Sequence, residues 1–190
     1  CLVLTERVPN LDSLLERMES GDHLHRYSVA WVDMVATGAH LGRAVLTRGD
    51  HATYDELVAE KPAAGADPLA FSPSGLAAVP RGVPNVLNRL AVRTFNEMWY
   101  RKAPVSHLGL ETITGFFHPL DMVGDWNRLY GRSGFLQYQF VVPFSEHEAF
   151  KRCFEMIVNS GHLSCLNVLK RFGPGNLSPQ RAVHQPRHHL

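Results

Sequence analysis

The chain has 190 residues, and 45% of them are hydrophobic, which is enough material for the core of one domain. Its 19 Lys and Arg residues nearly balance 18 Asp and Glu residues, so the net charge of +1 gives no reason to expect nucleic acid as a partner. No run of about 18 apolar residues occurs, so no transmembrane segment is predicted. The first residues show no basic leader or cleavage pattern, so no signal peptide is predicted either.

The first third of the chain predicts strands mixed with helices. A strand opens the chain, and Leu11, Leu14, Leu15 and Met18 then follow with the spacing of one helical face. Further strands are predicted over 27–33 and 42–49, and a short helix around 54–59. Residues 61–84 contain five prolines and predict a long Pro/Ala/Gly-rich loop, because that composition sustains neither a helix nor a central strand.

The rest of the chain continues the mixed pattern. Asn85 is expected to cap a helix that runs to about residue 100, and a strand is predicted over 108–117. Ser145 is expected to cap a helix over 146–158, between strands at 134–143 and 164–172. Successive strands lack helical crossovers, which predicts an α+β fold: an antiparallel β-sheet with helices packed on one face. No phosphate-cradling glycine loop is present.

The predicted strand 134–143 is the most informative stretch of the sequence. Alternation puts its apolar residues Leu136, Tyr138, Phe140 and Val142 on one face, which is expected to lie against a core. The other face carries Gln137 and Gln139 between apolar neighbours. These amides either meet water on a partly exposed face or bind a polyhydroxy or heteroaromatic ligand.

The last predicted strand has a similar pattern, with Leu166, Val168, Lys170 and Phe172 on one face. Lys170 is either a surface lysine with its stem on apolar neighbours or a cation that binds an anion in an apolar pocket. If the two strands line one cavity, two amides, a cation and apolar walls suit a phosphorylated sugar with an apolar tail.

Other polar residues give weaker indications. His118 precedes Pro119 and lies three residues before Asp121, so the carboxylate either orients the imidazole or the histidine simply occupies a turn. The histidines near the carboxyl terminus have no Cys or carboxylate partner, so we expect a disordered tail and no metal site. No residue is assigned as catalytic, because no Ser/His/Asp or Cys/His set is recognisable.

Seven segments in one order carry a resemblance to a known family. They are residues 27–33, 46–52, 95–100, 117–121, 126–128, 135–143 and 166–170. Together they closely resemble the decaprenylphosphoryl-β-D-ribose 2-oxidases, FAD-dependent flavoproteins of the vanillyl-alcohol oxidase superfamily. The similarity runs from near residue 1 to about Ser178.

The resemblance implies an oxidoreductase that oxidises the ribose 2-hydroxyl of a polyprenyl-phosphate sugar to a ketone and passes a hydride to FAD. A partner keto-reductase then completes the epimerisation to the arabinose donor for arabinan in cell wall biogenesis. The lipid-linked substrate implies a cell-envelope location, periplasmic or at the membrane surface.

The resemblance also implies a domain organisation. Residues 1–178 correspond to the substrate-binding domain, with loop 61–84 inside it, and an FAD-binding domain is expected upstream of Cys1. FAD would then be bound mainly outside this chain, so no cofactor-binding residue is assigned here. Residues 179–190 fit no family element and are expected to be a disordered tail that follows a truncation or frame change. A fragment of this kind is expected to be inactive alone.

Site residues follow from the same resemblance. Gln137 and Gln139 correspond to glutamines that face the substrate pocket, and Leu166, Val168, Lys170 and Phe172 correspond to the strand that lines it. Trp31 and His118 lie in matching motifs near the same cavity. Phe117 stands where a tyrosine can occur. Two alternatives stay open: a non-catalytic α+β module that binds a ligand or partner, and a decayed gene copy.

Overall fold

The computed structural model describes residues 1–59, 67, 69–71, 75, 78–81, 87–164 and 166–173. Most of the predicted loop 61–84, the predicted cap Asn85 and the whole predicted tail 179–190 lie outside these residues. Among the described helices, none is long and apolar enough to cross a membrane.

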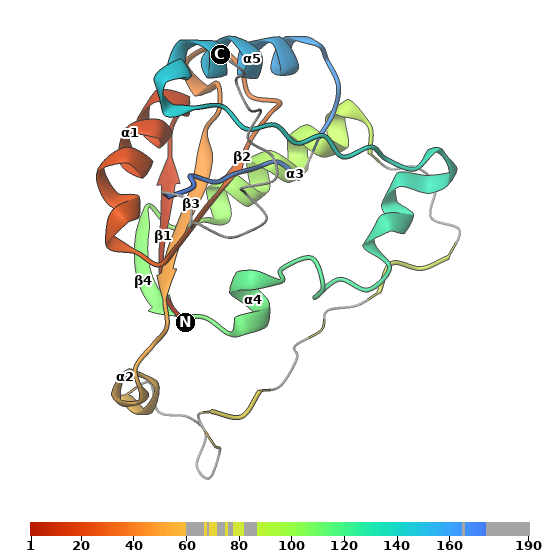
Figure 1. The fold of residues 1–190 in the computed structure, drawn as a ribbon. Coiled ribbons are helices and arrows are strands. Elements are labelled where there is room, and N and C mark those ends of the chain that lie inside the picture. Colours follow the sequence, from red (N-terminus) through yellow and green to blue (C-terminus); the bar gives the residue numbers. More distant parts are fainter. Residues whose placement is uncertain are drawn as a thin grey trace, which may run out of the picture.

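A five-stranded sheet forms the centre of the described structure (Figure 1). Its strands are β1 (Leu2–Val8), β2 (Tyr27–Val32), β3 (Ala44–Asp50), β4 (Ser106–Leu110) and β5 (Val168–Leu169), in the order β4-β1-β3-β2-β5. Every neighbouring pair is antiparallel, and β1 and β3 pair along their full length, from Leu2 opposite Asp50 to Val8 opposite Ala44. The predicted α+β class and antiparallel sheet are therefore confirmed.

One face of the sheet carries the hydrophobic core. Helix α1 (Leu11–Gly21) begins at Asn10, whose side chain accepts a hydrogen bond from the Ser13 amide at 2.9 Å. Helix α5 (His147–Asn159) lies beside it on the same face (Figure 1). The two helices and alternate positions of the strands bury a single apolar cluster: Val8, Leu11, Leu14, Met18, Ala30, Val32, Met34, Ala44, Leu46, Phe154 and Val158.

The opposite face is contacted by α3 (Arg89–Lys102) and α4 (Ile113–Phe117). A hydrogen bond from Asn96 of α3 to Asp33 holds α3 at the end of β2. A Cβ atom at Gly49 of β3 would lie 2.8 Å from the Phe116 ring, so α4 approaches the sheet closely there. The predicted one-sided helical layer thus describes α1 and α5, whereas α3 and α4 reach the other side.

The remaining elements are short. Helix α2 spans Tyr54–Ala59, as predicted. Short 3-10 helices span Asp22–Leu24, Gly38–His40 and Phe144–Glu146. The segment Trp126–Ser133 is also 3-10 helical but is interrupted by a kink at Gly131.

Several predicted boundaries are wrong. The predicted strand 108–117 ends after Leu110, because Thr112 accepts a hydrogen bond from the Gly115 amide at 3.0 Å and starts α4. Helix α3 is capped by Asn88, and the residue before α5 is Glu146 instead of Ser145. The predicted strand 164–172 is reduced to Val168–Leu169.

The prediction of a strand over 134–143 is also wrong in this structure. The segment has no regular secondary structure, and its predicted inward face is exposed except at Val142, with Leu136 completely accessible. A strand exists only through hydrogen bonds to a neighbouring strand. Within the described part of the chain the sheet ends at β4 on one side and β5 on the other, and 134–143 pairs with neither edge strand.

Candidate functional site

The centre of the candidate site is the pairing of Trp31 on β2 with Val168 on β5. Residues directly opposite each other in an antiparallel pair project from the same face, so the two side chains are neighbours. Trp31 is half-buried and Val168 is 66% exposed. The structure therefore brings together two residues that are 137 positions apart in the sequence and were both assigned to the site.

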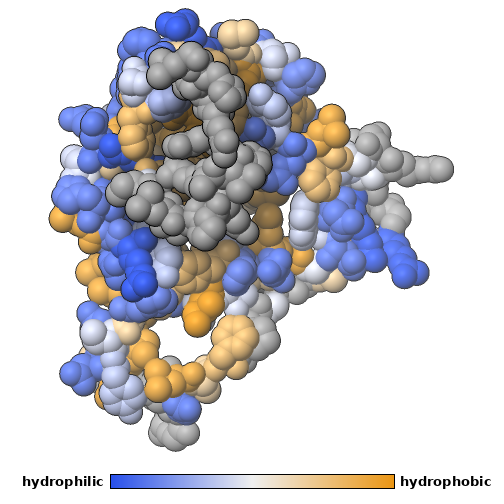
Figure 2. Space-filling view, in the orientation of Figure 1, coloured by the Kyte–Doolittle hydropathy of each residue, from blue (hydrophilic) through white to orange (hydrophobic). Residues whose placement is uncertain are grey.

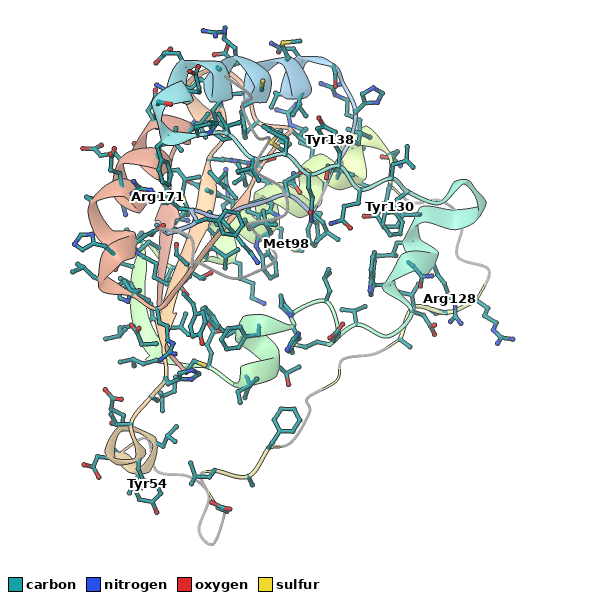
Figure 3. All side chains as sticks on the ribbon, in the orientation of Figure 1. Tyr54, Met98, Arg128, Tyr130, Tyr138 and Arg171 are labelled. Atoms are coloured by element: carbon teal, nitrogen blue, oxygen red, sulfur yellow. The ribbon has the colours of Figure 1, made fainter. Side chains whose placement is uncertain are left out.

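The alternation predicted for the last strand holds around β5. Leu169 packs against the hydrophobic core, and Arg171 donates to the Met18 carbonyl of α1 at 3.2 Å (Figure 3). The other four residues, Leu166, Val168, Lys170 and Phe172, are all exposed. Lys170 is therefore a solvent-accessible cation in an apolar neighbourhood, which agrees with either of its two interpretations.

An aromatic cluster extends the site along β2. Tyr27 shares the face of Trp31, and its ring packs edge-on against Phe117 at 4.9 Å. Phe116 contacts Phe117 at 4.8 Å, and the Tyr27 hydroxyl lies 3.2 Å from Nε2 of His51. These edge-on aromatic rings cover the same face of β2 as Trp31, four residues along the strand from the Trp31–Val168 pair.

His118 joins this cluster at its edge. Its ring lies 6.4 Å from that of Phe117, and its Nδ1 lies 3.8 Å from a carboxylate oxygen of Asp121. Both side chains are exposed, so the attraction between them is weak and screened. The structure therefore places His118 beside the candidate site, oriented only loosely by its acidic neighbour.

The structure does not bring Gln137 and Gln139 into the sheet. Both are exposed on the segment that leads to α5, where Tyr138 also lies (Figure 3). Neither side chain forms a hydrogen bond with another described residue. The segment is fixed at its ends by ring contacts, with Phe135 4.6 Å from Tyr130 and Phe140 6.5 Å from Phe150.

Sequence reasoning missed the buried polar groups that hold the site in place. Asp33, immediately after β2, is buried and accepts hydrogen bonds from Asn96 at 2.7 Å and from Arg43 at 2.8 Å. Arg43 also pairs with Glu97 at 2.6 Å, and hydrogen bonds from Arg43 and Arg101 hold the pKa of Glu97 below its usual value. No sequence motif marks these contacts, because they join residues far apart in the chain.

A second cluster of polar side chains lies on the core side of the sheet. Arg48 of β3 forms an ion pair with Glu6 of β1, and Glu6 forms a second ion pair with Arg17 of α1 at 2.8 Å. Burial raises the pKa of Asp22 beside them, although Ser28 and Arg48 oppose that shift. One sequence signal existed here: Arg48 occupies a position that alternation assigns to the apolar face of β3.

A surface pocket of about 380 Å³ lies elsewhere, between the start of α1 and α5. Asp12 and Lys151 form an ion pair of 2.6 Å at its rim. None of the predicted site residues lines this pocket. It lies on the side of the sheet opposite the Trp31–Val168 pair, so we do not assign the site to it.

The sequence of the chain was compared with those of known proteins. No protein-family model matches the chain. A decaprenylphosphoryl-β-D-ribose oxidase from Mycolicibacterium smegmatis is 45% identical over 156 residues, which cover 82% of this chain and 33% of that protein. A Streptomyces coelicolor protein named "uncharacterized protein in mprA 5′ region" is 29% identical over 177 residues, or 90% of this chain and 47% of that protein.

The fold and the comparisons agree with the resemblance. The chain is an α+β module with an antiparallel sheet, and its sequence is similar to part of a decaprenylphosphoryl-β-D-ribose oxidase. The resemblance carried by the seven segments is therefore confirmed. The chain spans between a third and about half of the length of these two curated relatives.

Proposed function

We propose that this chain is the substrate-binding part, residues 1–178, of an FAD-dependent oxidoreductase. Its substrate would be decaprenylphosphoryl-β-D-ribose, whose ribose 2-hydroxyl is oxidised to the 2-keto sugar. The observation that carries the proposal is the 45% identity to the M. smegmatis oxidase over most of the chain. Identity at this level across 156 residues supports a shared role for the corresponding part of both proteins.

The exposed sheet face supports a contact with a planar cofactor. Trp31 and the exposed Val168 lie side by side on this face, and Phe117 packs on Tyr27 of the same strand, so the face offers apolar side chains to an aromatic ring system. The residues that hold FAD itself would lie mainly in sequence outside this chain. When bound, FAD would supply the acceptor for the hydride from the sugar carbon, and the hydroxyl proton would go to a base.

The remaining site residues have roles that follow from their chemistry. The amides of Gln137 and Gln139 can donate to and accept from sugar hydroxyls, and the Lys170 ammonium can pair with the phosphate. Leu166 and Phe172 supply apolar surface for the start of the polyprenyl tail. His118 lies at the edge of the same face, where it can orient a polar group of the sugar.

The same proposal includes a cellular context. The 2-keto sugar would be reduced by a partner keto-reductase, which completes epimerisation to the arabinose donor for cell-wall arabinan. Because the substrate is lipid-linked, the enzyme would act at the cell envelope, periplasmic or at the membrane surface.

A segment exchange tests the proposal. The matched segment of the M. smegmatis oxidase is replaced by this chain, and the hybrid is purified with its flavin. We expect the flavin absorbance to bleach without oxygen when a polyprenyl-phosphoryl ribose is added, with the keto sugar detected by mass spectrometry. Lys170→Met in the hybrid should raise the KM for substrate at least about tenfold.

The matched control is Arg152→Met, which removes an exposed cation from α5 on the other side of the sheet. This change should leave KM unaltered. A hybrid that binds flavin but does not oxidise the sugar would overturn the oxidase proposal. That result would favour the non-catalytic module, for which the exposed apolar segment around Leu136 and Tyr138 would be the partner surface.

A further inference from the structure

The outer side of α3 exposes apolar and aromatic side chains. Met98 is 58% exposed and Trp99 is 42% exposed, and the Trp99 ring stacks on that of Phe95 at 6.1 Å. Leu90, earlier in the helix, and Val105, just after it, are also exposed. We call Leu90, Phe95, Met98 and Trp99 the α3 stripe. Figure 3 shows Met98 near the middle of the viewed face, at some distance from the α1 side of the sheet.

The inner side of α3 makes contacts that prevent the helix from rotating about its axis. Val92 and Asn96 are buried, Asn96 donates to Asp33, and the Arg43 guanidinium lies 4.6 Å over the Tyr100 ring. These residues recur at every fourth position, so they define one side of the helix. Because these contacts hold that side at Asp33, just after β2, and Arg43, just before β3, the fold fixes which side of α3 carries the α3 stripe.

The charge of α3 differs from that of the other long helices. It carries four cations, Arg89, Arg93, Arg101 and Lys102, against the single carboxylate of Glu97. Glu97 is already paired with Arg43 and Arg101. Helix α5 has two cations and two carboxylates, and α1 has one cation and three carboxylates. Among these three helices only α3 has more cations than carboxylates. Arg89 lies near Gly161 at the end of α5, so the cations next to the α3 stripe are Arg101 and Lys102, three and four positions after Met98.

We propose that the α3 stripe docks on an anionic phospholipid surface. Aromatic and Met side chains would enter the headgroup region, while the flanking Arg and Lys side chains pair with lipid phosphates. This inference rests on the proposed function, in which the substrate is carried by a polyprenyl phosphate in a membrane. It adds the element of the chain that would meet that membrane.

Charge complementarity favours this occupant over two others. A second copy of the chain would present the same cationic helix, and like charges oppose such a contact. A protein domain packed on the stripe would have to bury several cations, and charged residues are depleted at the core of such interfaces. An anionic bilayer accommodates the apolar stripe and the cations together.

Sedimentation with lipid vesicles tests the proposal on the 190-residue chain. We expect binding to vesicles of equal parts phosphatidylglycerol and phosphatidylcholine, weakening as salt rises, and little binding to phosphatidylcholine alone. The double variant Met98→Ser/Lys102→Gln should lower the partition coefficient at least about fivefold. The control Arg152→Gln/Met156→Ser removes the same kinds of group at the same spacing from α5, and should bind as the parent chain does.

A second measurement keeps the test decisive if a variant folds poorly, which circular dichroism would reveal. Quenching by brominated lipid, taken as the difference between the parent chain and Trp99→Phe, should show Trp99 within the bilayer. Equal loss in both double variants, equal binding to neutral vesicles or no Trp99 quenching would overturn the proposal. A dimer abolished only by Met98→Ser/Lys102→Gln would show that a second copy covers the stripe instead.

The vesicle result and the segment exchange can fail separately. Vesicle binding with an inactive hybrid would overturn the oxidase proposal and leave the membrane surface in place. An active hybrid whose chain ignores anionic vesicles would overturn only the role of the α3 stripe.

Discussion

The side-chain amide of Asn96 donates a hydrogen bond to Asp33 at 2.7 Å, and both side chains are buried. The same Asp33 carboxylate accepts the Val35 amide and the Arg43 guanidinium. Helix α3 is thus attached to the end of β2 through one carboxylate that has several donors. Apolar packing is not directional, whereas these hydrogen bonds are. They therefore fix the rotation of α3 about its axis and determine which of its residues face outward.

We expect Asn96→Ala to lower the free energy of unfolding by about 1–3 kcal/mol, because the Asp33 oxygen loses a buried donor that water cannot replace. Thr94→Ala, on the exposed side of the same helix, is the control and should change stability by at most about 0.5 kcal/mol. Urea unfolding followed by circular dichroism measures both. Equal effects would show that the Asn96 contact contributes nothing beyond helix propensity.

Two glycines with nearly the same positive φ allow backbone strain and side-chain crowding to be separated. Gly38 has a φ of +62° with open space around it, whereas Gly42 has a φ of +66° and its added Cβ would lie 2.7 Å from the Leu11 Cβ. Gly38→Ala should cost about 1 kcal/mol from the left-handed backbone alone. Gly42→Ala should cost about 2–4 kcal/mol, because it also displaces the start of α1. Thermal unfolding of both variants gives the difference, and similar losses would contradict the crowding argument.

The spacing of apolar residues along the sequence predicted those helices and strands that have local contacts or one strictly apolar face. Leu11, Leu14 and Met18 predict α1, and all three are buried against the sheet. The strands β2 and β3 are likewise found within two residues of their predicted bounds. The failures have a common physical cause. Strand formation at 134–143 depends on a partner strand, which no property of Gln137 or Tyr138 specifies.

The site was predictable only in part. Trp31 and Val168 were both assigned to it, and strand pairing brings them together, yet nothing in either segment predicts that register. The contacts of Asp33, Arg43 and Asn96 escaped prediction because each residue alone resembles an ordinary surface group. Burial of such polar side chains is a property of the assembled fold.

Asp22 and Asp50 should give opposite pH effects. Burial raises the pKa of Asp22 in the folded chain, against the opposing influence of Ser28 and Arg48, so its ionised form disfavours folding at neutral pH. The favourable contribution of protonated Asp22 is present below about pH 4 and is lost as pH rises through the folded pKa. Asp22→Asn should therefore raise the melting temperature at pH 7, and the gain should vanish as pH falls toward 4.

Asp50 provides the contrast. Hydrogen bonds from the Arg26 amide at 2.8 Å and from His25 lower the pKa of Asp50, so its ionised form favours folding. That contribution is present above about pH 4 and is lost as pH falls through the lowered folded pKa. Asp50→Asn should lower the melting temperature at pH 7, with a deficit that shrinks in acid. Two variants with the same pH trend would refute the assignment of opposite shifts.

The segment 134–143 should exchange its amide hydrogens quickly in this chain. Most of its side chains are exposed and its backbone belongs to no strand, whereas β3 is paired on both sides by β1 and β2. Hydrogen exchange measured by mass spectrometry should show the amides of 136–142 labelled within seconds, on the order of a thousandfold or more before those of β3. In the segment-exchange hybrid, the same amides should become protected if Gln137 and Gln139 line a formed substrate pocket. Protection that stays low in an active hybrid would remove both glutamines from the site, since a residue that positions a sugar cannot lie on an unfixed backbone.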